Sequence, residues 1–153
     1  MRWEGLDDFL SRVSDRLDPP RGEGRLTEYG DLDFLTPEEL AVVRPAAVLV
    51  GVNPSDVDVL GRSAPYVTGT MFRITPVVGL LPADFEPKPD PTEVADVFET
   101  PLDFLMNIAN HKVGSAVYNG QERKFYEMPH GGFRIWGVTA GIIRKLYHTL
   151  YDD

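Results

Sequence analysis

The sequence predicts an α+β fold in which a mixed β-sheet lies between helices at both ends of the chain. Two apolar runs predict buried strands at residues 46–50 (AAVLV) and 72–81 (FRITPVVGLL). Two amphipathic patterns predict helices at residues 5–17 and 138–150. An Asn119-Gly120 pair between strand-like segments predicts a β-hairpin. With 153 residues, of which 42% are hydrophobic, the chain suits one domain spanning residues 1–153.

The run at residues 72–81, preceded by YVTGT at 66–70, is the expected centre of the sheet. Apolar and β-branched residues occupy both alternating positions, which predicts a strand buried on both faces. Gly79 interrupts this run without ending it. Pro76 lacks the N–H that a central strand needs, so we expect a bulge or one-sided pairing there.

The amino-terminal half contains two predicted helices. The first carries an apolar stripe and ends at Pro19-Pro20; the stripe consists of Leu6, Phe9, Leu10, Val13 and Leu17. Thr36-Pro37-Glu38-Glu39 combines an N-cap, a proline at the first helical position and a glutamate, which predicts a short second helix ended by Pro45. Asn53-Pro54 then predicts a turn, followed by a short strand containing Val57 and Val59.

The carboxy-terminal half begins with a proline-rich, exposed segment at residues 82–91. We expect extended chain up to Thr100, which caps a short helix over residues 101–109 with Leu102, Leu105 and Met106 inward. The hairpin follows, returning through a strand at residues 123–128. A loop at 130–132 leads to a strand at 133–136, whose Phe133 and Trp136 we expect to seal the core. The last helix buries Val138, Ile142, Ile143, Leu146, Tyr147 and Leu150.

Composition narrows the classes of partner. The formal charge of −9 disfavours nucleic acid and anionic membranes, so an anionic substrate needs a local cationic cluster or a divalent metal ion. The absence of cysteine excludes disulfides, thiolate metal sites and thiol nucleophiles, and it is compatible with the cytoplasm. No segment is long and apolar enough to span a bilayer.

Motif spacing alone indicates little chemistry. His111, His130 and His148 are scattered, without a carboxylate neighbour in metal-ligand spacing, which favours solvated or hydrogen-bonded structural roles. No glycine-rich phosphate loop is present, and no serine lies in a nucleophile-elbow context. Spacing therefore gives no metal site and no catalytic residue.

Four longer segments resemble Nudix hydrolases of the coenzyme A pyrophosphatase group. They read GVNPSDVDVLGR, YVTGTMFRITPVVGLLP, DPTEVADVFETPLDFLMNIANH and ERKFYEMPHGGFRIWGVTAGII, and RPAAVLV resembles the first strand of that domain. The resemblance implies a Nudix fold and metal-dependent hydrolysis, with Mg²⁺ or Mn²⁺, of a nucleotide diphosphate such as CoA. The implied products are 4′-phosphopantetheine and adenosine 3′,5′-bisphosphate.

The sequence departs from this family at its catalytic motif. The Nudix signature is G-x5-E-x7-R-E-U-x-E-E-x-G-U, and its R-E-U-x-E-E core is absent from the 153 residues. In the family these glutamates share one helix face and hold the metal ion against the diphosphate. Here Val50 is followed directly by Gly51-Val52, which resembles the G-U pair that closes the motif.

Two explanations of the Val50–Gly51 junction stay open. Either the two residues are bonded in a protein that has lost its catalytic helix, or the sequence omits a segment between them. We favour the omission, because losing a helix that covers the core would expose an apolar patch and drive dimerisation. If a segment is omitted, the expected function is that of a CoA diphosphatase. If the two residues are bonded, the expected function is that of an inactive Nudix-scaffold module for binding or assembly. The sequence alone therefore leaves enzymatic activity undecided.

Five residues are candidates for contact with substrate or metal. Arg73, in an apolar strand, is the candidate for contact with a phosphate, while Tyr66, Thr68 and Tyr126 are candidates for lining a nucleotide pocket. Glu93 is a candidate auxiliary carboxylate near the metal, by resemblance to Nudix enzymes that use carboxylates outside the motif. The catalytic residues are unknown, because the motif glutamates are absent.

Overall fold

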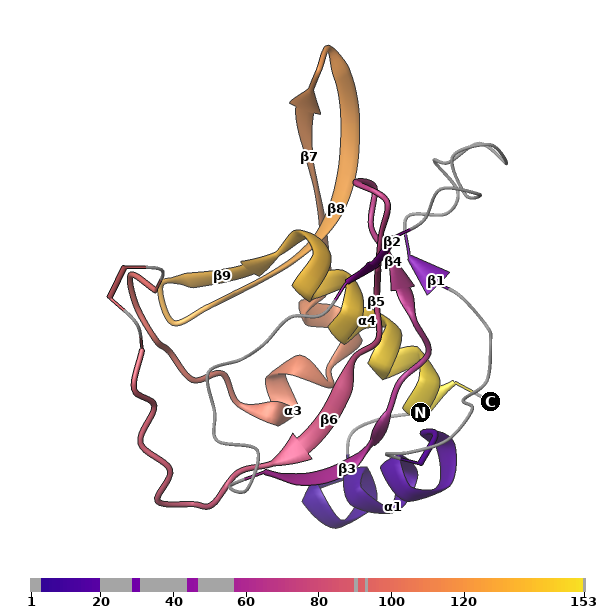
Figure 1. Ribbon diagram of the computed structural model, residues 1–153, viewed down its shortest axis with the longest axis vertical. Coiled ribbons are helices and arrows are strands. Elements are labelled where there is room, and N and C mark those ends of the chain that lie inside the picture. The colour runs from indigo at the N-terminus through magenta and orange to yellow at the C-terminus, as the bar shows by residue number, and fades with distance from the viewer. Residues whose placement is uncertain are drawn as a thin grey trace. The chain divides into compact units, whose positions relative to one another are not determined.

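The computed structural model describes residues 4–19, 29–30, 44–46, 57–89, 91–92 and 94–152, and it confirms the predicted α+β class (Figure 1). The chain forms two compact units. One contains the described residues up to Arg16 together with those from Thr100 onward, and the other lies within Leu17–Glu99. The prediction of one domain over residues 1–153 stays a prediction.

The first unit packs two helices with a three-stranded antiparallel sheet. Its strands follow the order β7-β8-β9, and α4 packs on β8 and β9 while α1 packs on α4. The elements are α1 (Leu6–Arg16), α3 (Leu102–Leu105), the 3₁₀ helix η3 (Ile108–Asn110), β7 (Lys112–Tyr118), β8 (Gln121–His130), β9 (Phe133–Trp136) and α4 (Gly137–Tyr151).

Two tight turns shape this sheet, and both depend on residues that accept positive φ. Asn119 (φ 50°) and Gly120 (φ 76°) form the tip between β7 and β8, as the sequence predicted for a type I′ turn. Gly131 (φ 58°) and Gly132 (φ 86°) form the turn between β8 and β9. The returning strand β8 is longer than predicted, because its pairing with β7 and β9 continues to both turns.

The core of this unit lies where α1 and α4 meet. Phe9 and Val13 of α1 are buried, as are Leu150 and Tyr151 of α4. The expected inward position of Leu6 is wrong: its side chain is 52% exposed at the first turn of α1. The α4 stripe is confirmed in part, because Tyr147 and Leu150 are buried while Ile142 and Leu146 are half-buried.

The second unit contains two small sheets. β3 and β6 pair antiparallel, with a register shift between Val59 and Gly61. The other sheet has the order β1-β4-β5-β2, in which β4 and β5 are antiparallel and the outer pairs are parallel. The bounds are β1 (Tyr29–Gly30), β2 (Arg44–Ala46), β3 (Asp58–Arg62), β4 (Tyr66–Val67), β5 (Phe72–Ile74) and β6 (Val77–Leu80).

The predicted long strand at residues 72–81 is wrong in two respects. It is two strands, β5 and β6, which belong to different sheets and are separated at Thr75-Pro76. It is also half-exposed, since Phe72, Val77 and Leu80 are all exposed. The proline explains the break: its missing N–H ends the ladder, and its carbonyl instead accepts the Ser63 N–H at 3.0 Å.

Two further predictions in the first unit are wrong. Pro101, not Thr100, is the N-cap of α3, and the Thr100 hydroxyl is buried without a hydrogen-bond partner. Phe133 and Trp136 do not seal the core, because they are 38% and 54% exposed. The two residues are three positions apart on β9, so their side chains point to opposite faces of the sheet.

Several predictions concern residues that the structure does not describe. They are the helix begun at Thr36, the strand at 46–50 beyond Ala46, the Asn53-Pro54 turn and the Val50–Gly51 junction. The prolines at residues 82–89 lie in exposed chain without helix or strand, as predicted.

Candidate functional site

The candidate residues of the second unit lie on the β4–β5 hairpin. Tyr66 and Thr68 are buried: Tyr66 is the first residue of β4, and Thr68 lies in the turn that follows this strand. The Thr68 hydroxyl accepts the Phe72 N–H at 3.1 Å and lies 3.0 Å from the Thr70 hydroxyl. Met71 adopts φ 67° in this turn. Thr68 therefore holds the turn between the two strands that position Tyr66.

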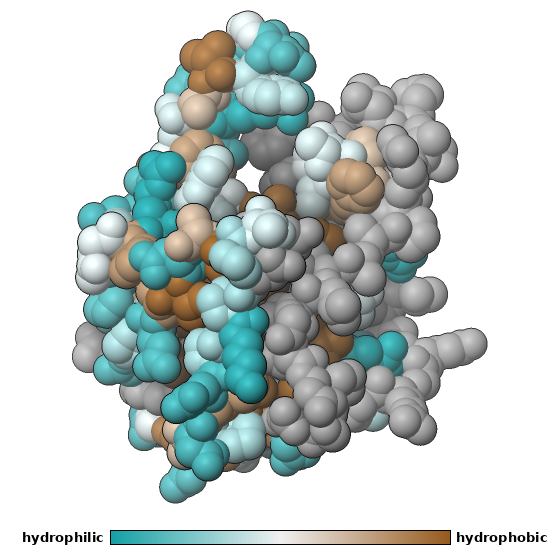
Figure 2. Space-filling model, turned by 60° about the vertical axis from the view of Figure 1, so that its left-hand side comes forward, coloured by the Kyte–Doolittle hydropathy of each residue, from teal (hydrophilic) through white to brown (hydrophobic). Residues whose placement is uncertain are grey.

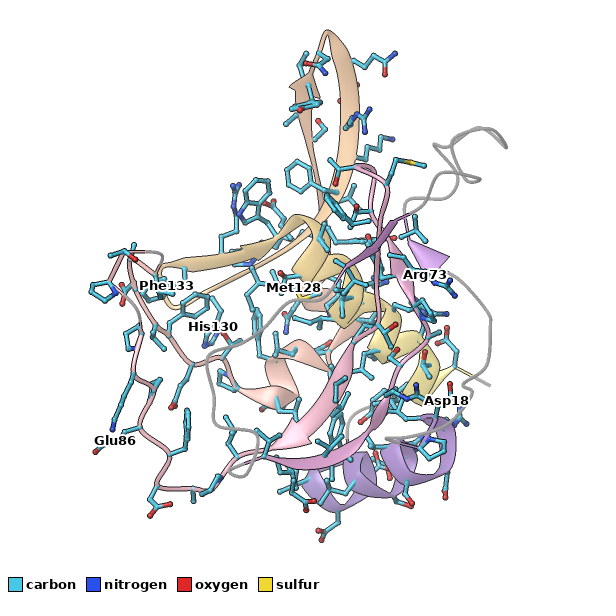
Figure 3. The ribbon with its side chains drawn as sticks, in the orientation of Figure 1. Asp18, Arg73, Glu86, Met128, His130 and Phe133 are labelled. Carbon is cyan, nitrogen blue, oxygen red and sulfur yellow. The ribbon has the colours of Figure 1, made fainter. Side chains whose placement is uncertain are left out.

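Arg73 extends from β5, the strand paired with both β4 and β2 (Figure 3). It is paired with Val67, whereas its neighbour Ile74 is paired with Tyr66. Because side chains alternate along a strand, Arg73 and Tyr66 lie on opposite faces of the hairpin. The structure thus brings Tyr66 and Thr68 together and directs the half-buried Arg73 to the other face.

Tyr126 belongs to the first unit, where β8 packs on α4. The guanidinium of Arg144 lies over its ring, 5.1 Å from the ring centroid. Arg144 also donates from Nε to His148 Nε2 at 2.7 Å, and His148 Nδ1 is hydrogen-bonded to the Asp152 carboxylate. Tyr126 is therefore one end of a row of polar contacts along α4.

This row fixes the protonation pattern of His148 and the orientation of Arg144. Since Nε2 of His148 accepts from Arg144, its proton lies on Nδ1 and is donated to Asp152. Among the described residues, Nη1 and Nη2 of Arg144 make no hydrogen bond. An aromatic face beside a fixed guanidinium can bind a planar group that carries an anion.

Sequence reasoning selected Tyr126 but missed Arg144, His148 and Asp152. The available signal was their spacing of four residues, which places all three on one side of a helix. The predicted structural role of the histidines is confirmed for two of them: His148 lies in this row, and His111 Nε2 donates to the Leu105 carbonyl at 2.7 Å. His130 packs against Phe104, with ring centroids 4.5 Å apart.

Comparison with known proteins identifies relatives of this chain. Nudix hydrolase 15, mitochondrial, from Arabidopsis thaliana is 29% identical over 154 aligned positions, which cover 94% of this chain and 53% of that protein. An uncharacterized Nudix hydrolase, NudL, is 33% identical in Escherichia coli (strain SMS-3-5 / SECEC) and 35% identical in Cronobacter sakazakii. Each of these alignments spans 106 residues, 69% of this chain and 55% of the relative.

The chain is a homologue of the Nudix hydrolases. This agrees with the resemblance found in the sequence. The chain spans about half the length of the curated relatives it matches.

No family model matches the chain. In the described residues, no helix is long and apolar enough to cross a membrane.

Nudix hydrolases generally use Mg²⁺ or Mn²⁺, and the residues that the structure describes do not form a site that fits such an ion. No group of three or more histidine, aspartate or glutamate side chains within the described ranges could hold a metal. The R-E-U-x-E-E core is absent from the sequence, and Glu93 lies outside the described residues. The residues that the structure describes therefore include aromatic and cationic side chains suited to binding, but they include no set of metal ligands.

Proposed function

We propose that this protein hydrolyses the diphosphate bond of coenzyme A or one of its derivatives. The observation that carries the proposal is its homology to Nudix hydrolases, including one that aligns with 94% of the chain. Hydrolases of that family act on nucleotide diphosphates. The choice of CoA rests on the four sequence segments that resemble the coenzyme A pyrophosphatase group. A cytoplasmic location belongs to the same proposal.

The proposal gives the named residues roles in binding. Tyr126 stacks against the adenine or a neighbouring planar group, and Arg144 contacts a phosphate through Nη1 and Nη2. Arg73 contacts a phosphate in the second unit, and Tyr66 and Thr68 line a nucleotide pocket, with Thr68 also holding the turn of the hairpin. Water attack and metal binding need glutamates that these residues do not supply, so no catalytic step is assigned to them.

A second function follows from the absence of those glutamates. A Nudix scaffold that has kept its binding residues and lost its metal ligands would bind a nucleotide or a partner without hydrolysing it. This binding or assembly module is the alternative to the hydrolase. The missing R-E-U-x-E-E core favours it for the 153 residues as they stand.

Turnover and binding measured on one sample separate these functions. Folded protein of verified mass is incubated with CoA and Mg²⁺ or Mn²⁺, and the products are separated by chromatography. Release of 4′-phosphopantetheine and adenosine 3′,5′-bisphosphate that stops with EDTA supports the hydrolase. Calorimetric binding of CoA in EDTA, with no turnover in either metal, supports the module. Neither binding nor turnover contradicts both functions.

A matched pair of variants tests the role of Arg144. R144Q and K145Q each remove one positive charge from adjacent positions of α4. If Arg144 contacts a phosphate, R144Q should weaken CoA binding about tenfold or more, because a charge-assisted hydrogen bond is worth about 1.5–3 kcal/mol. K145Q should change binding little. Equal losses in the two variants would indicate a general charge effect and remove Arg144 from the site.

A further inference from the structure

The edge strand β7 (Lys112–Tyr118) has an exposed apolar face. Val113 and Val117 are 63% and 75% exposed, and with Ser115 they project from one face, since side chains alternate along a strand. The β7–β8 hairpin extends past β9 and α4 (Figure 1), and apolar surface lies beside hydrophilic surface on it (Figure 2). Exposed valines on a regular strand are a typical site for pairing with another chain.

The edge of β7 that is unpaired among the described residues also presents backbone hydrogen-bonding groups. Tyr118 and Gln121 flank the two-residue turn, so they exchange hydrogen bonds with each other. Along an antiparallel pair this pattern alternates, and therefore Val113, Ser115 and Val117 direct their N–H and C=O groups away from β8. Among the described residues, β7 pairs with β8 alone. The outward groups thus belong to the residues of the exposed apolar face.

We propose that β7 pairs antiparallel with β7 of a second copy of the chain, with Ser115 on the two-fold axis. This register places Val113 opposite Val117 of the second copy, and Ser115 opposite its own counterpart. All the outward N–H and C=O groups of these three residues then find partners. The three-stranded sheets of the two copies then join in one continuous sheet of order β9-β8-β7-β7-β8-β9.

The sequence of β7 is what favours a second copy over an unrelated strand. KVGSAVY reads as a near-palindrome about Ser115, with apolar opposite apolar and small opposite small at Gly114 and Ala116. The pairing also places no like charges directly opposite each other, because Lys112, the charged residue of β7, meets Tyr118 of the second copy. An isologous contact needs this self-complementarity.

Sedimentation and crosslinking test the proposal on the full 153-residue chain. We expect the mass to double as concentration rises from about 1 μM to about 1 mM, in the range typical of weak interfaces. The chain has no cysteine, so S115C introduces a single thiol at the axis. A short bismaleimide should crosslink S115C far faster than the control T139C, an exposed position on α4. A monomer at every concentration, or equal crosslinking of both variants, overturns the proposal.

Charge variants test the register. V113K/V117K places like charges opposite each other and should weaken the dimer about tenfold or more. V113K/V117E places opposite charges opposite each other and should restore it. Both valines are highly exposed, so circular dichroism should show both variants folded. A dimer unaffected by V113K/V117K overturns the proposal, as does capture of only unrelated extended peptides at β7. If either variant fails to fold, the crosslinking rates of S115C and T139C still test the proposal.

Discussion

Three buried polar atoms among the described residues of the first unit lack hydrogen-bond partners. One is the Thr100 hydroxyl; the other two, Nδ1 of His111 and the hydroxyl of Tyr151, belong to titratable groups that respond differently to pH. Burial, with a further contribution from Asp8, raises the pKa of Tyr151 to about 12, so this phenol stays neutral at physiological pH. Burial lowers the pKa of His111 below 6.5; the hydrogen bond to Leu105 opposes this effect, while Arg144 and His148 add to it. Of these two groups, only His111 can therefore change its protonation state within the pH range of ordinary unfolding experiments.

Acid should destabilise the protein through His111. The unfolded chain takes up this proton near pH 6.5 and the folded chain only at lower pH, so stability is lost as pH falls from 6.5 to the folded pKa. The loss is at most about 1.4 kcal/mol per pH unit for one proton. Urea unfolding at several pH values measures it. In H111Q the pH dependence should be smaller, whereas the control H130Q should keep it. An unchanged profile in H111Q contradicts the prediction.

At the scale of elements, two glycines of the β7–β8 hairpin have different functions. Gly120 has φ 76°, and nothing lies within 4 Å of an added Cβ. Gly114 has no positive φ, but its Cβ would lie 2.9 Å from Cε2 of Phe125. Phe125 in turn packs edge-on against Trp136, with ring centroids 5.6 Å apart. One glycine is therefore needed for conformation and the other for space.

Alanine at each position should separate these two effects. G120A should lose about 1–2 kcal/mol of stability from backbone strain alone. G114A should also be destabilised, and it should displace the Phe125 ring from Trp136. In a W3F background Trp136 is the sole tryptophan, so its native-state fluorescence reports this displacement. The emission should change in G114A and stay constant in G120A. A change of equal size in both would refute the assignment.

Local signals were sufficient for the parts of the fold that depend on neighbouring residues. Asn119-Gly120 predicted its hairpin because only a few residue types accept two successive positive φ values. The strand at 72–81 was misread because apolar content does not reveal which strand pairs with which; Pro76 divides it between two sheets. Trp136 was assigned to the core for a similar reason, since exposure depends on whether another element covers that face.

The candidate site could be predicted only in part, for the same reason. Tyr126 was recognised as an aromatic residue suited to a pocket, but its partner Arg144 lies on α4, eighteen positions away in the sequence. The four-residue spacing of Arg144, His148 and Asp152, which the sequence analysis missed, places them on one side of a helix but does not reveal what that side packs against. The opposite faces occupied by Arg73 and Tyr66 follow from the β4–β5 register, which no residue pattern fixed.

At the scale of the whole molecule, the open question is the junction between Val50 and Gly51. Homology to Nudix hydrolases and the missing R-E-U-x-E-E core are both properties of the same sequence. They are compatible in two ways: a bonded junction in an inactive relative, or an omitted segment in an active one. The two cases predict different molecules, since a true trans peptide holds the two Cα atoms about 3.8 Å apart and leaves no room for a helix between them.

Intact mass of the protein isolated from its natural source distinguishes these cases. We expect a mass several kilodaltons above the 17.1 kDa of the 153 residues, because the catalytic helix covers apolar surface that a stable monomer would otherwise expose. Peptide sequencing across the junction should then show glutamates between Val50 and Gly51, and the longer chain should hydrolyse CoA with Mg²⁺ or Mn²⁺. A source protein with Val50 bonded to Gly51 contradicts this expectation. Its apolar surface would then have to be covered by other residues or by a second copy, and the binding or assembly function would take the place of hydrolysis.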